Sequence, residues 1–324
     1  MDKWKVLVTR RIPEAGLELL SPYCSIEVHQ EDRPMSRPEL LAAAADKDGV
    51  LCLLTDKVDA ELMDAAPRVR GFANYAVGFD NMDLAEATRR RIPLSNTPDV
   101  LTDATADMAW ALLFAAARRV VESDGVMRSG AWRGWGPMQF VGGDVCGATL
   151  GVVGAGRIGA AMASRAVGFK MRVLYSDARR NERLEAETGA AFVPFEELLA
   201  KSDYVSVHVP LMPETRHLFD YAALSRMKRT AYLINTARGP VIDEAALVRA
   251  LREGLIAGAG LDVYEREPLM AEGLSELPNV VLTPHTASAT VASRKGMSLK
   301  AAANLLAMLR GERAPDCVNP AVYA

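Results

Sequence analysis

The segment LGVVGAGRIG at residues 150–159 decides the fold of this chain. It joins a run of apolar residues to three glycines in the pattern G-x-G-x-x-G, and an alanine-rich helical pattern follows. A second apolar run at residues 171–175 comes next, and Asp177 stands just after it. The order of strand, glycine turn, helix, strand and acid is that of a dinucleotide-binding unit.

Each glycine of this pattern has a physical reason. Gly154 permits a tight turn, Gly156 lets the main chain approach a pyrophosphate, and Gly159 lets the helix pack closely on the strand. The free amides and the positive end of the helix dipole then face the phosphates. Glycine turns also occur for backbone reasons alone, but the acid after the second strand favours the nucleotide interpretation.

Asp177 bears on the choice of cofactor. A carboxylate at the tip of the second strand can accept hydrogen bonds from an adenosine ribose and repels a 2′-phosphate, which favours NAD(H) over NADP(H). Arg179 and Arg180 follow at once and weaken this inference. They are either a solvated helix start or a phosphate clamp, and NADP(H) stays an alternative.

Composition limits the class of protein. The chain has 324 residues, enough for two domains, and its net charge of -3 gives no broad basic surface for nucleic acid. Its four cysteines are scattered without the spacing of a zinc or redox motif, so we expect reduced thiols, no metal and a cytoplasmic location. The most apolar long stretch, residues 104–117, is too short to span a bilayer, and no signal peptide opens the chain.

The first hundred residues alternate short β-rich runs with helical patterns, which predicts a parallel sheet with helices on both faces. We expect strands at residues 5–9, 25–28, 50–54, 69–73 and 92–95, and helices at 13–20, 36–45, 59–66 and 83–90. The loop at residues 75–81 follows the fourth strand, where Gly78 either presents amides to an anion or merely turns the chain. The break at Asn96-Thr97-Pro98 marks the domain boundary.

A long helix is expected from Asp103 to about Glu122, and because it is apolar on nearly every face it should be buried, either between domains or between subunits. The loop that follows carries Trp132 and Trp135, which we interpret as a dimer contact, with stacking near a ligand as the alternative. Alternation then resumes, with strands at 204–209, 231–235, 256–262 and 280–283 and a helix from Asp243 to Arg252. A last helix at 292–310 should return to the first domain.

Three polar residues stand just past strand ends in this half: Arg238, Glu267 and His285. A guanidinium can hold a carboxylate by a two-pronged hydrogen bond, and a histidine beside a carboxylate can donate a proton near neutral pH. With a hydride donor nearby, these parts suffice to reduce a 2-oxo acid to a 2-hydroxy acid.

Each of these residues also has a structural interpretation when it is taken singly. Arg238 could pair with a surface acid, and His285 after a proline could be structural. Spacing alone does not choose between Glu265 and Glu267. The other histidines are weaker candidates: His29, His208 and His217.

Five motifs together resemble the D-isomer-specific 2-hydroxyacid dehydrogenases. They are VVGAGRIG at 152–159, SVHVPLMP at 206–213, LINTARG at 233–239, GLDVYEREP at 260–268 and PHTAS at 284–288. Two further segments, NYAVGFDNMD at 74–83 and TPDVLTDATADMAW at 97–110, are similar to the glyoxylate/hydroxypyruvate reductase branch. The resemblance implies two doubly wound parallel-sheet domains. One is a flavodoxin-like substrate domain at 1–98 and 288–324, and the other is a Rossmann nucleotide domain at 99–287 that forms most of a homodimer contact.

The resemblance also assigns roles. It places the substrate-binding arginine at Arg238, the acid at Glu267 rather than Glu265, and the acid-base residue at His285. It adds Val77 and Gly78 as amides for the substrate carboxylate. It implies cofactor contacts at Gly154, Gly156, Arg157, Ile158, Gly159, Asp177, Val209, Pro210, Thr236, Ala237, Asp262 and Ser288. One departure is Thr286-Ala287, where the family more often has Ile-Gly.

The sequence therefore predicts an enzyme that reduces glyoxylate, hydroxypyruvate or a close 2-oxo acid with NAD(P)H. A different class of protein, a nucleotide-sensing module that acts through partner proteins, would use the same fold. A pure sensor has no need of an acid paired with a histidine. A dehydrogenase of another small oxyanion such as phosphite is disfavoured by Val77, where a cation would be expected.

Overall fold

The computed structural model describes residues 3–324, so the first two residues of the predicted substrate domain lie outside the described part. The chain divides into two compact units. The first runs to Leu101 and resumes at Ala289–Ala324, and the second is Thr102–Ser288. The substrate and nucleotide roles that the resemblance implies for these regions remain predictions.

The first unit contains a five-stranded sheet in the order β2-β1-β3-β4-β5. The strands are β1 (Trp4–Val8), β2 (Cys24–Val28), β3 (Gly49–Cys52), β4 (Phe72–Asn74) and β5 (Leu94–Ser95). All neighbouring strands pair in parallel. This is the flavodoxin-like order, which confirms the predicted fold class for this unit.

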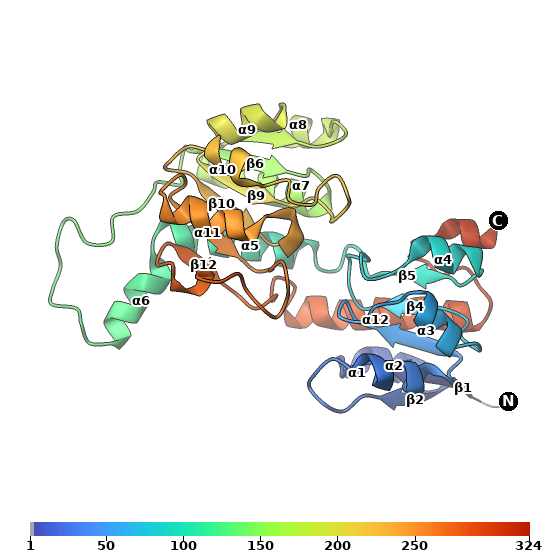
Figure 1. Ribbon diagram of the computed structural model, residues 1–324. Helices are drawn as coiled ribbons and strands as arrows, with labels where there is room; N and C mark the ends of the chain where they lie inside the picture. The colour runs from blue at the N-terminus through green and yellow to red at the C-terminus, as the bar shows by residue number, and fades with distance from the viewer. Residues whose placement is uncertain (1–2) are drawn as a thin grey trace. The chain divides into compact units, whose positions relative to one another are not determined.

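Helices flank this sheet, and local sequence explains where several of them begin. They are α1 (Glu14–Leu20), α2 (Arg37–Ala44), α3 (Ala60–Ala65), α4 (Leu84–Arg89) and α12 (Val291–Leu309). Asp59 caps α3 by accepting from the Leu62 amide at 3.2 Å, and Asp83 caps α4 by accepting from the Glu86 amide at 2.9 Å. The last helix, α12, packs against α1, β3 and β4 (Figure 1).

The second unit contains a seven-stranded sheet in the order β12-β11-β10-β9-β6-β7-β8. The strands are β6 (Thr149–Val153), β7 (Arg172–Ser176), β8 (Ala191–Phe192), β9 (Tyr204–Val207), β10 (Tyr232–Asn235), β11 (Gly258–Leu261) and β12 (Val280–Leu282). The order reverses between β6 and β9, which is the switch point where ligands bind in such sheets. The Rossmann prediction is confirmed.

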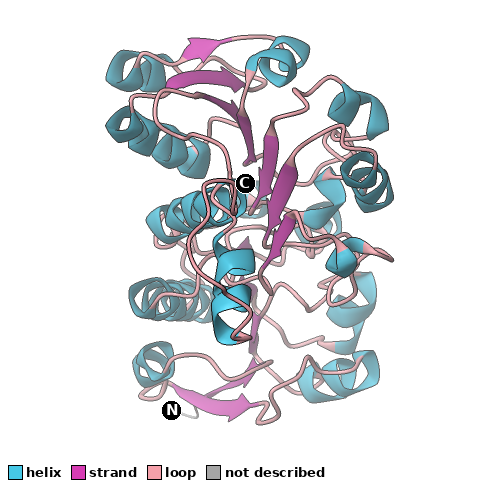
Figure 2. Ribbon diagram, turned by 90° about the vertical axis from the view of Figure 1, so that its left-hand side faces the viewer, coloured by secondary structure: helices cyan, strands magenta, loops and turns pink. Residues whose placement is uncertain are grey.

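Two apolar cores cover the two faces of this sheet, because successive side chains of a strand point to opposite sides. On β10, Leu233 belongs to one core and its neighbour Ile234 to the other. The helices of the unit are α5 (Thr102–Ala117), α6 (Val120–Arg128), α7 (Arg157–Ala166), α8 (Glu182–Thr188), α9 (Phe195–Lys201), α10 (Tyr221–Ser225) and α11 (Glu244–Arg252). Figure 2 shows helices on both sides of the strands.

The helix expected from Asp103 to Glu122 is instead two helices, α5 and α6. The Ala117 carbonyl accepts a hydrogen bond from the Gly143 amide at 3.0 Å, and Arg119 takes a left-handed backbone with φ of 51°. Both features end α5. The expected burial of α5 is found, but against β10, β11 and α7 of its own unit, whereas α6 has no buried residue.

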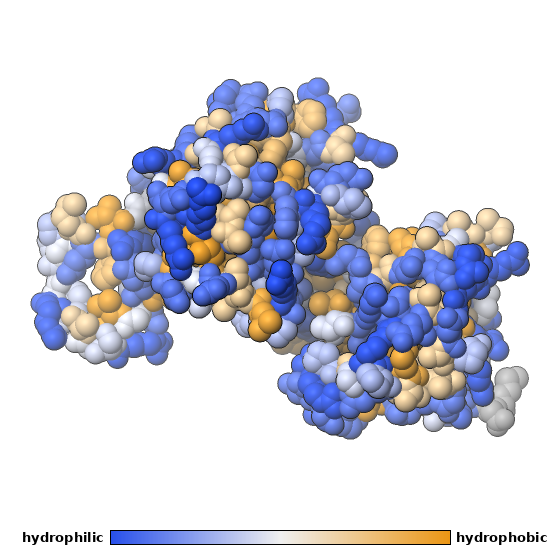
Figure 3. Space-filling view, in the orientation of Figure 1, coloured by the Kyte–Doolittle hydropathy of each residue, from blue (hydrophilic) through white to orange (hydrophobic). Residues whose placement is uncertain are grey.

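The segment at residues 120–141, which we call the arm, exposes an unusual amount of apolar surface. Trp135 is 84% exposed and Met138 is 82% exposed. Val120, Val121 and Met127 are also exposed on α6. Figure 3 shows apolar side chains gathered over α6 and the loop that follows it. Large apolar patches of this kind mark interaction surfaces.

We predict that Gly159→Ala lowers the stability of the second unit. A Cβ at this position would lie 1.9 Å from the Gly154 carbonyl oxygen, so α7 would have to move away from β6. Overpacking of this kind costs about 1–3 kcal/mol. Thermal unfolding measures the change.

Gly168→Ala is the matched control, because a Cβ there meets nothing within 4 Å. Its effect should be less than about 1 kcal/mol. Equal melting temperatures for the two variants would contradict the close approach of α7 to the glycine turn.

Candidate active site

The glycine turn lies at the switch point of the second sheet. Gly154 follows β6 with φ of 94°, and a Cβ there would be 2.7 Å from the Val209 amide nitrogen. Gly156 caps α7, and a Cβ at Gly156 would meet nothing within 4 Å. The turn is therefore closed toward the loop after β9 and open at the helix N-terminus, where Arg157 and Ile158 begin α7.

Asp177 reaches this turn from the end of β7. Its Oδ2 accepts from the Ala155 amide at 2.6 Å. Of the two arginines that follow, Arg180 pairs with Glu185 at 2.8 Å, and Arg179 is exposed. Arg180 is thus engaged by a residue of α8.

The loops after β9 and β10 carry the next predicted cofactor residues. Val209 and Pro210 follow β9, and Thr236 and Ala237 follow β10. The Thr236 hydroxyl is buried and has no hydrogen-bond partner within residues 3–324. A buried hydroxyl without a partner calls for an explanation, and a bound polar ligand supplies one. These residues fit a nucleotide at the switch point.

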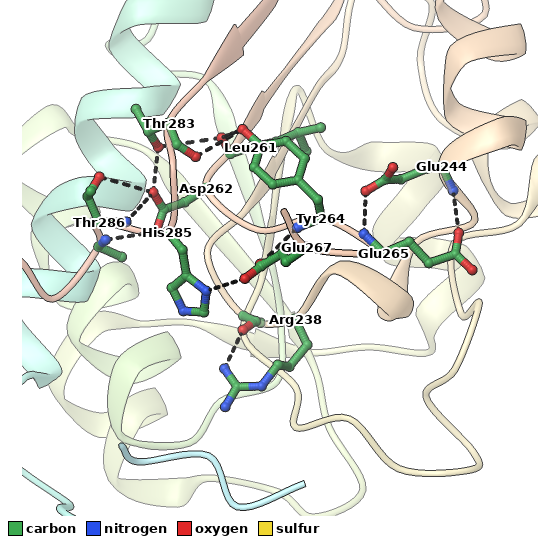
Figure 4. A network of polar contacts seen from close by, with 12 residues as sticks. Arg238, Glu244, Leu261, Asp262, Tyr264, Glu265, Glu267, Thr283, His285 and Thr286 are labelled. Atoms are coloured by element: carbon green, nitrogen blue, oxygen red, sulfur yellow. Dashed lines mark hydrogen bonds and ion pairs between the residues drawn. The ribbon is translucent and has the colours of Figure 1, made fainter. Parts of the chain in front are cut away.

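Arg238, Glu267 and His285 come together at the same edge of the sheet, after β10, β11 and β12 respectively (Figure 4). The His285 Nδ1 lies 2.8 Å from the Glu267 Oε2. The other Glu267 oxygen accepts from the Tyr264 amide at 3.1 Å. The carboxylate thus holds the ring by one nitrogen and leaves Nε2 for another partner.

The charge on Glu267 follows from its surroundings. Partial burial alone would raise the pKa of the Glu267 carboxyl. The hydrogen bond with His285 and the charges of His285 and Arg238 outweigh burial and hold that pKa below its ordinary value. Glu267 is therefore an ionised carboxylate at neutral pH.

Asp262 shapes the turn that carries His285. This carboxylate is fully buried and accepts from the Thr283 hydroxyl at 2.5 Å, the Thr286 amide at 2.8 Å and the Ala287 amide at 2.7 Å. His285 itself has a left-handed backbone with φ of 54°, a conformation that costs about 1–2 kcal/mol in a non-glycine residue. The hydrogen bonds of Asp262 offset this cost, while its role as a cofactor contact remains a prediction.

The competing acid and histidines lie elsewhere. Glu265 pairs with His217 at 2.9 Å rather than with His285. His208 is 2.8 Å from the Ser206 hydroxyl, and burial lowers the pKa of its ring to about 4, so the ring is neutral near pH 7. Geometry therefore selects Glu267 and His285. His217 lies in a turn.

In the first unit, the loop after β4 presents amides in a fixed direction. The Ala76 carbonyl accepts from the Thr97 amide at 2.9 Å, and the Val77 carbonyl accepts from the Asn96 side chain at 2.7 Å. The C=O and N–H of a trans peptide point in opposite directions, so the amides of Val77 and Gly78 face away from these anchors. Neither amide donates a hydrogen bond to any of the described residues. The loop fits an anion.

Sequence reasoning missed the anchors of this loop. The sequence patterns indicated Asn96 only as part of a domain boundary and Asn74 only as part of the motif at 74–83. The Asn74 side chain in fact donates to the Gly78 carbonyl at 2.9 Å. The available signal was an asparagine at the end of each of two neighbouring strands. Asparagine is uncommon inside strands, so its presence there indicates a side chain with a specific partner.

The described residues contain no group of three or more His, Cys, Asp or Glu side chains placed to hold a metal ion. Among the helices of residues 3–324, none is both long and apolar enough to cross a membrane. Ser288, the last predicted cofactor residue, closes the second unit just after the turn that Asp262 supports.

Comparison with known proteins gives consistent matches. The family described as D-isomer specific 2-hydroxyacid dehydrogenase, NAD binding domain, matches residues 110–287. A glyoxylate reductase of Thermococcus onnurineus is 51% identical over 321 residues, covering 98% of this chain and 96% of that protein.

Solved structures agree with the sequence matches. A glyoxylate reductase from Paecilomyes thermophila is 33% identical, with a TM-score of 0.87 and coverage of 99% of both chains. An NADPH-dependent glyoxylate/hydroxypyruvate reductase from Sinorhizobium meliloti, solved with NADP and malonate, is 34% identical. Its TM-score is 0.85, and the match covers 98% of this chain and 97% of that one.

We predict that Asp262→Asn destabilises the second unit. An amide can accept on one atom only, so its nitrogen would face a main-chain N–H of the turn and leave it without an acceptor. An unsatisfied buried donor costs about 1–3 kcal/mol. Thermal unfolding measures this loss.

Asp124→Asn makes the same chemical change in an exposed pair with Arg128 and should cost less than about 1 kcal/mol. If Asp262→Asn were no more destabilising than this control, Asp262 would not support the turn.

Proposed function

The chain belongs to the D-isomer specific 2-hydroxyacid dehydrogenases, and from this premise we propose that it reduces a small 2-oxo acid with NAD(P)H. The substrate class is glyoxylate, hydroxypyruvate or a close 2-oxo acid, and the product is the D-2-hydroxy acid. The observation that carries the proposal is the 2.8 Å contact between His285 and an ionised Glu267, with Arg238 near enough to lower the pKa of that glutamate.

Each residue has one role in this reaction. The Arg238 guanidinium binds the substrate carboxylate by two parallel hydrogen bonds. The His285 Nε2 donates a proton to the 2-oxo oxygen, which becomes the hydroxyl of the product. Glu267 holds the Nδ1 side of the ring and stabilises its protonated form before the transfer. When bound, the reduced nicotinamide supplies the hydride that C2 receives.

The loop after β4 supports a second contact with the substrate carboxylate. We propose that the amides of Val77 and Gly78 donate to it, because Asn96 and Thr97 hold the carbonyls of this loop in the opposite direction. An unchanged KM for glyoxylate in an Asn96→Ala variant would contradict this role. The first unit is accordingly proposed as the substrate domain and the second as the nucleotide domain.

We propose NAD(H) as the preferred cofactor, with NADP(H) as the alternative. Asp177 reaches the glycine turn, and Arg180 is engaged by Glu185 rather than directed to a 2′-phosphate. The proposed contacts of the dinucleotide are Gly154, Gly156, Arg157, Ile158, Gly159, Val209, Pro210, Thr236, Ala237, Asp262 and Ser288. The Sinorhizobium relative was solved with NADP, so the family does not exclude the phosphorylated cofactor.

The arm supports a homodimer. Its exposed apolar side chains, with Trp135 84% exposed, are typical of a surface that a second copy covers. A monomer mass by light scattering would contradict this proposal. We also propose a cytoplasmic location, which is supported by four free cysteine thiols.

The alternative of a nucleotide sensor without catalysis has less support. A sensor requires the glycine turn and Asp177, but it does not require a histidine that is held through one nitrogen by a carboxylate. Purified protein that bound NADH and turned over no 2-oxo acid would favour the sensor.

We predict that Arg238→Gln and His285→Gln nearly abolish the reduction of glyoxylate. Losing the charge partner of a bound carboxylate should lower kcat/KM by about 100-fold or more, and losing the acid should lower kcat by about 100- to 10,000-fold. Initial rates with NADH and glyoxylate measure both changes.

Arg226→Gln, on an exposed arginine that ends α10, is the control for Arg238 and should retain the rate of the parent. Parent-like rates in the Arg238 and His285 variants would exclude the proposed reaction.

We predict that Asp177→Asn shifts the cofactor preference toward NADPH. Removing a charge that lies near a 2′-phosphate relieves about 1 kcal/mol of repulsion, which corresponds to roughly a fivefold change in the ratio of kcat/KM values. Glu187→Gln, near the far end of α8, is the control and should leave the ratio unchanged. An unchanged ratio in Asp177→Asn would mean that this carboxylate does not select the cofactor.

A further inference from the structure

We propose that Glu244 is a positioning residue for the reaction, because it holds both ends of the loop that presents Glu267 to His285. The inference rests on the proposed reduction of a 2-oxo acid and adds a residue to its machinery. Glu244 does not touch the substrate or His285. It acts through the loop at residues 265–271, which we call the acid loop.

Glu244 bonds to the two ends of the acid loop. Its Oε1 accepts from the Glu265 amide at 2.5 Å, and its Oε2 accepts from the Ala271 amide at 2.9 Å. Glu267 lies between these two points in the chain. One carboxylate therefore closes the acid loop across its base, and each of its oxygens has a separate amide to satisfy.

Glu244 is buried at the start of a helix. It is the first residue of α11, where Asp243 caps the helix by accepting from the Ala246 amide at 2.9 Å. The side chain of Glu244 is buried, with the residue only 4% exposed. The helix packs into the apolar core of the second unit, so the acid loop is tied to a packed element.

Ionisation of Glu244 is unfavourable at this buried position. Burial is the largest effect and, together with the nearby charges of Glu265 and Glu267, it holds the pKa of the Glu244 carboxyl above its ordinary value, against the opposing hydrogen bonds from the two amides. No ion pair of Glu244 is found within the described chain. Burying an acid beside two other acids lowers the stability of the fold. The hydrogen bonds of this acid hold the backbone of the acid loop in place.

A second set of contacts ties the acid loop to its neighbours. The Glu265 side chain bonds to His217 at 2.9 Å and accepts from the Glu244 amide at 3.4 Å. A Cβ at Gly239 would lie 1.9 Å from the Tyr264 carbonyl, so the segment that carries Arg238 runs directly against this region. Figure 4 shows Glu244 and Glu265 on the other side of Glu267 from His285.

The chemical consequence concerns the protonated ring that the reduction consumes. A carboxylate that is held at hydrogen-bond distance stabilises the protonated ring, and a carboxylate on a loose loop does so less. The charged groups that face Glu267 are His285 after β12, Arg238 after β10 and Glu244 on α11. Activity falls as the pH rises, and a looser acid loop should make it fall at a lower pH.

The test compares Glu244→Gln with the parent and with Glu272→Gln, an exposed glutamate just beyond the acid loop. Glutamine matches the size of Glu244 but accepts on one atom only, so one of the two amides loses its partner. We expect kcat for glyoxylate reduction to fall about tenfold, because small misplacements of a reacting group reduce rates strongly. KM should change less than about twofold, because Arg238 still binds the carboxylate.

The pH profile separates positioning from a purely structural role. In Glu244→Gln, the pH at which kcat/KM has fallen to half should move down by about half a unit or more, and Glu272→Gln should match the parent. A lower melting temperature with an unmoved profile would overturn the proposal. If Glu244→Gln does not fold, Glu244→Asp keeps the charge, is too short for both amides, and should move the profile in the same direction.

Hydrogen exchange distinguishes this inference from the proposed function. If the parent reduced no 2-oxo acid, the proposed function would fail. Hydrogen exchange at the Glu265 and Ala271 amides would still test their hydrogen bonds with Glu244. Faster exchange there in Glu244→Gln than in Glu272→Gln supports the tie of the acid loop to α11. Unchanged exchange at both amides overturns it.

Discussion

Parallel pairing of the strands is the constraint on which the rest of the structure depends. When all strands of a sheet run in the same direction, their carboxyl ends meet at one edge, and residues far apart in the sequence become neighbours. In the second unit this edge collects Gly154 after β6, Arg238 after β10, Glu267 after β11 and His285 after β12. Helices on both faces fix the edge, so the polar side chains are held by a buried scaffold.

The sequence was most informative where local patterns have a single physical cause. The glycine turn and the acid after β7 predicted the second sheet. The alternation of short β-rich runs with helical patterns predicted the first sheet. The same logic failed at Arg119, since a long apolar pattern cannot reveal that the Ala117 carbonyl is taken by Gly143 from a returning loop. That hydrogen bond joins residues far apart in the sequence, so it does not change the hydrophobic pattern of the helix.

The candidate site shows a similar division. Residue types at strand ends pointed to Arg238 and His285, but their spacing could not choose Glu267 over Glu265, because the choice depends on which side chain faces His217. The main-chain partners of Asp262 and Glu244 were hidden for a related reason. Both are carboxylates that accept from main-chain amides, and any amide can serve as donor, so sequence contains no mark of the partner.

The discontinuity of the first unit has a consequence for synthesis on the ribosome. Its sheet is translated early, but α12, which packs on β3 and β4, comes only with the last residues of the chain. The second unit is one continuous stretch and has all seven strands once Ser288 has left the exit tunnel. The nascent protein thus carries one unit with its full sheet while the other still lacks a helix.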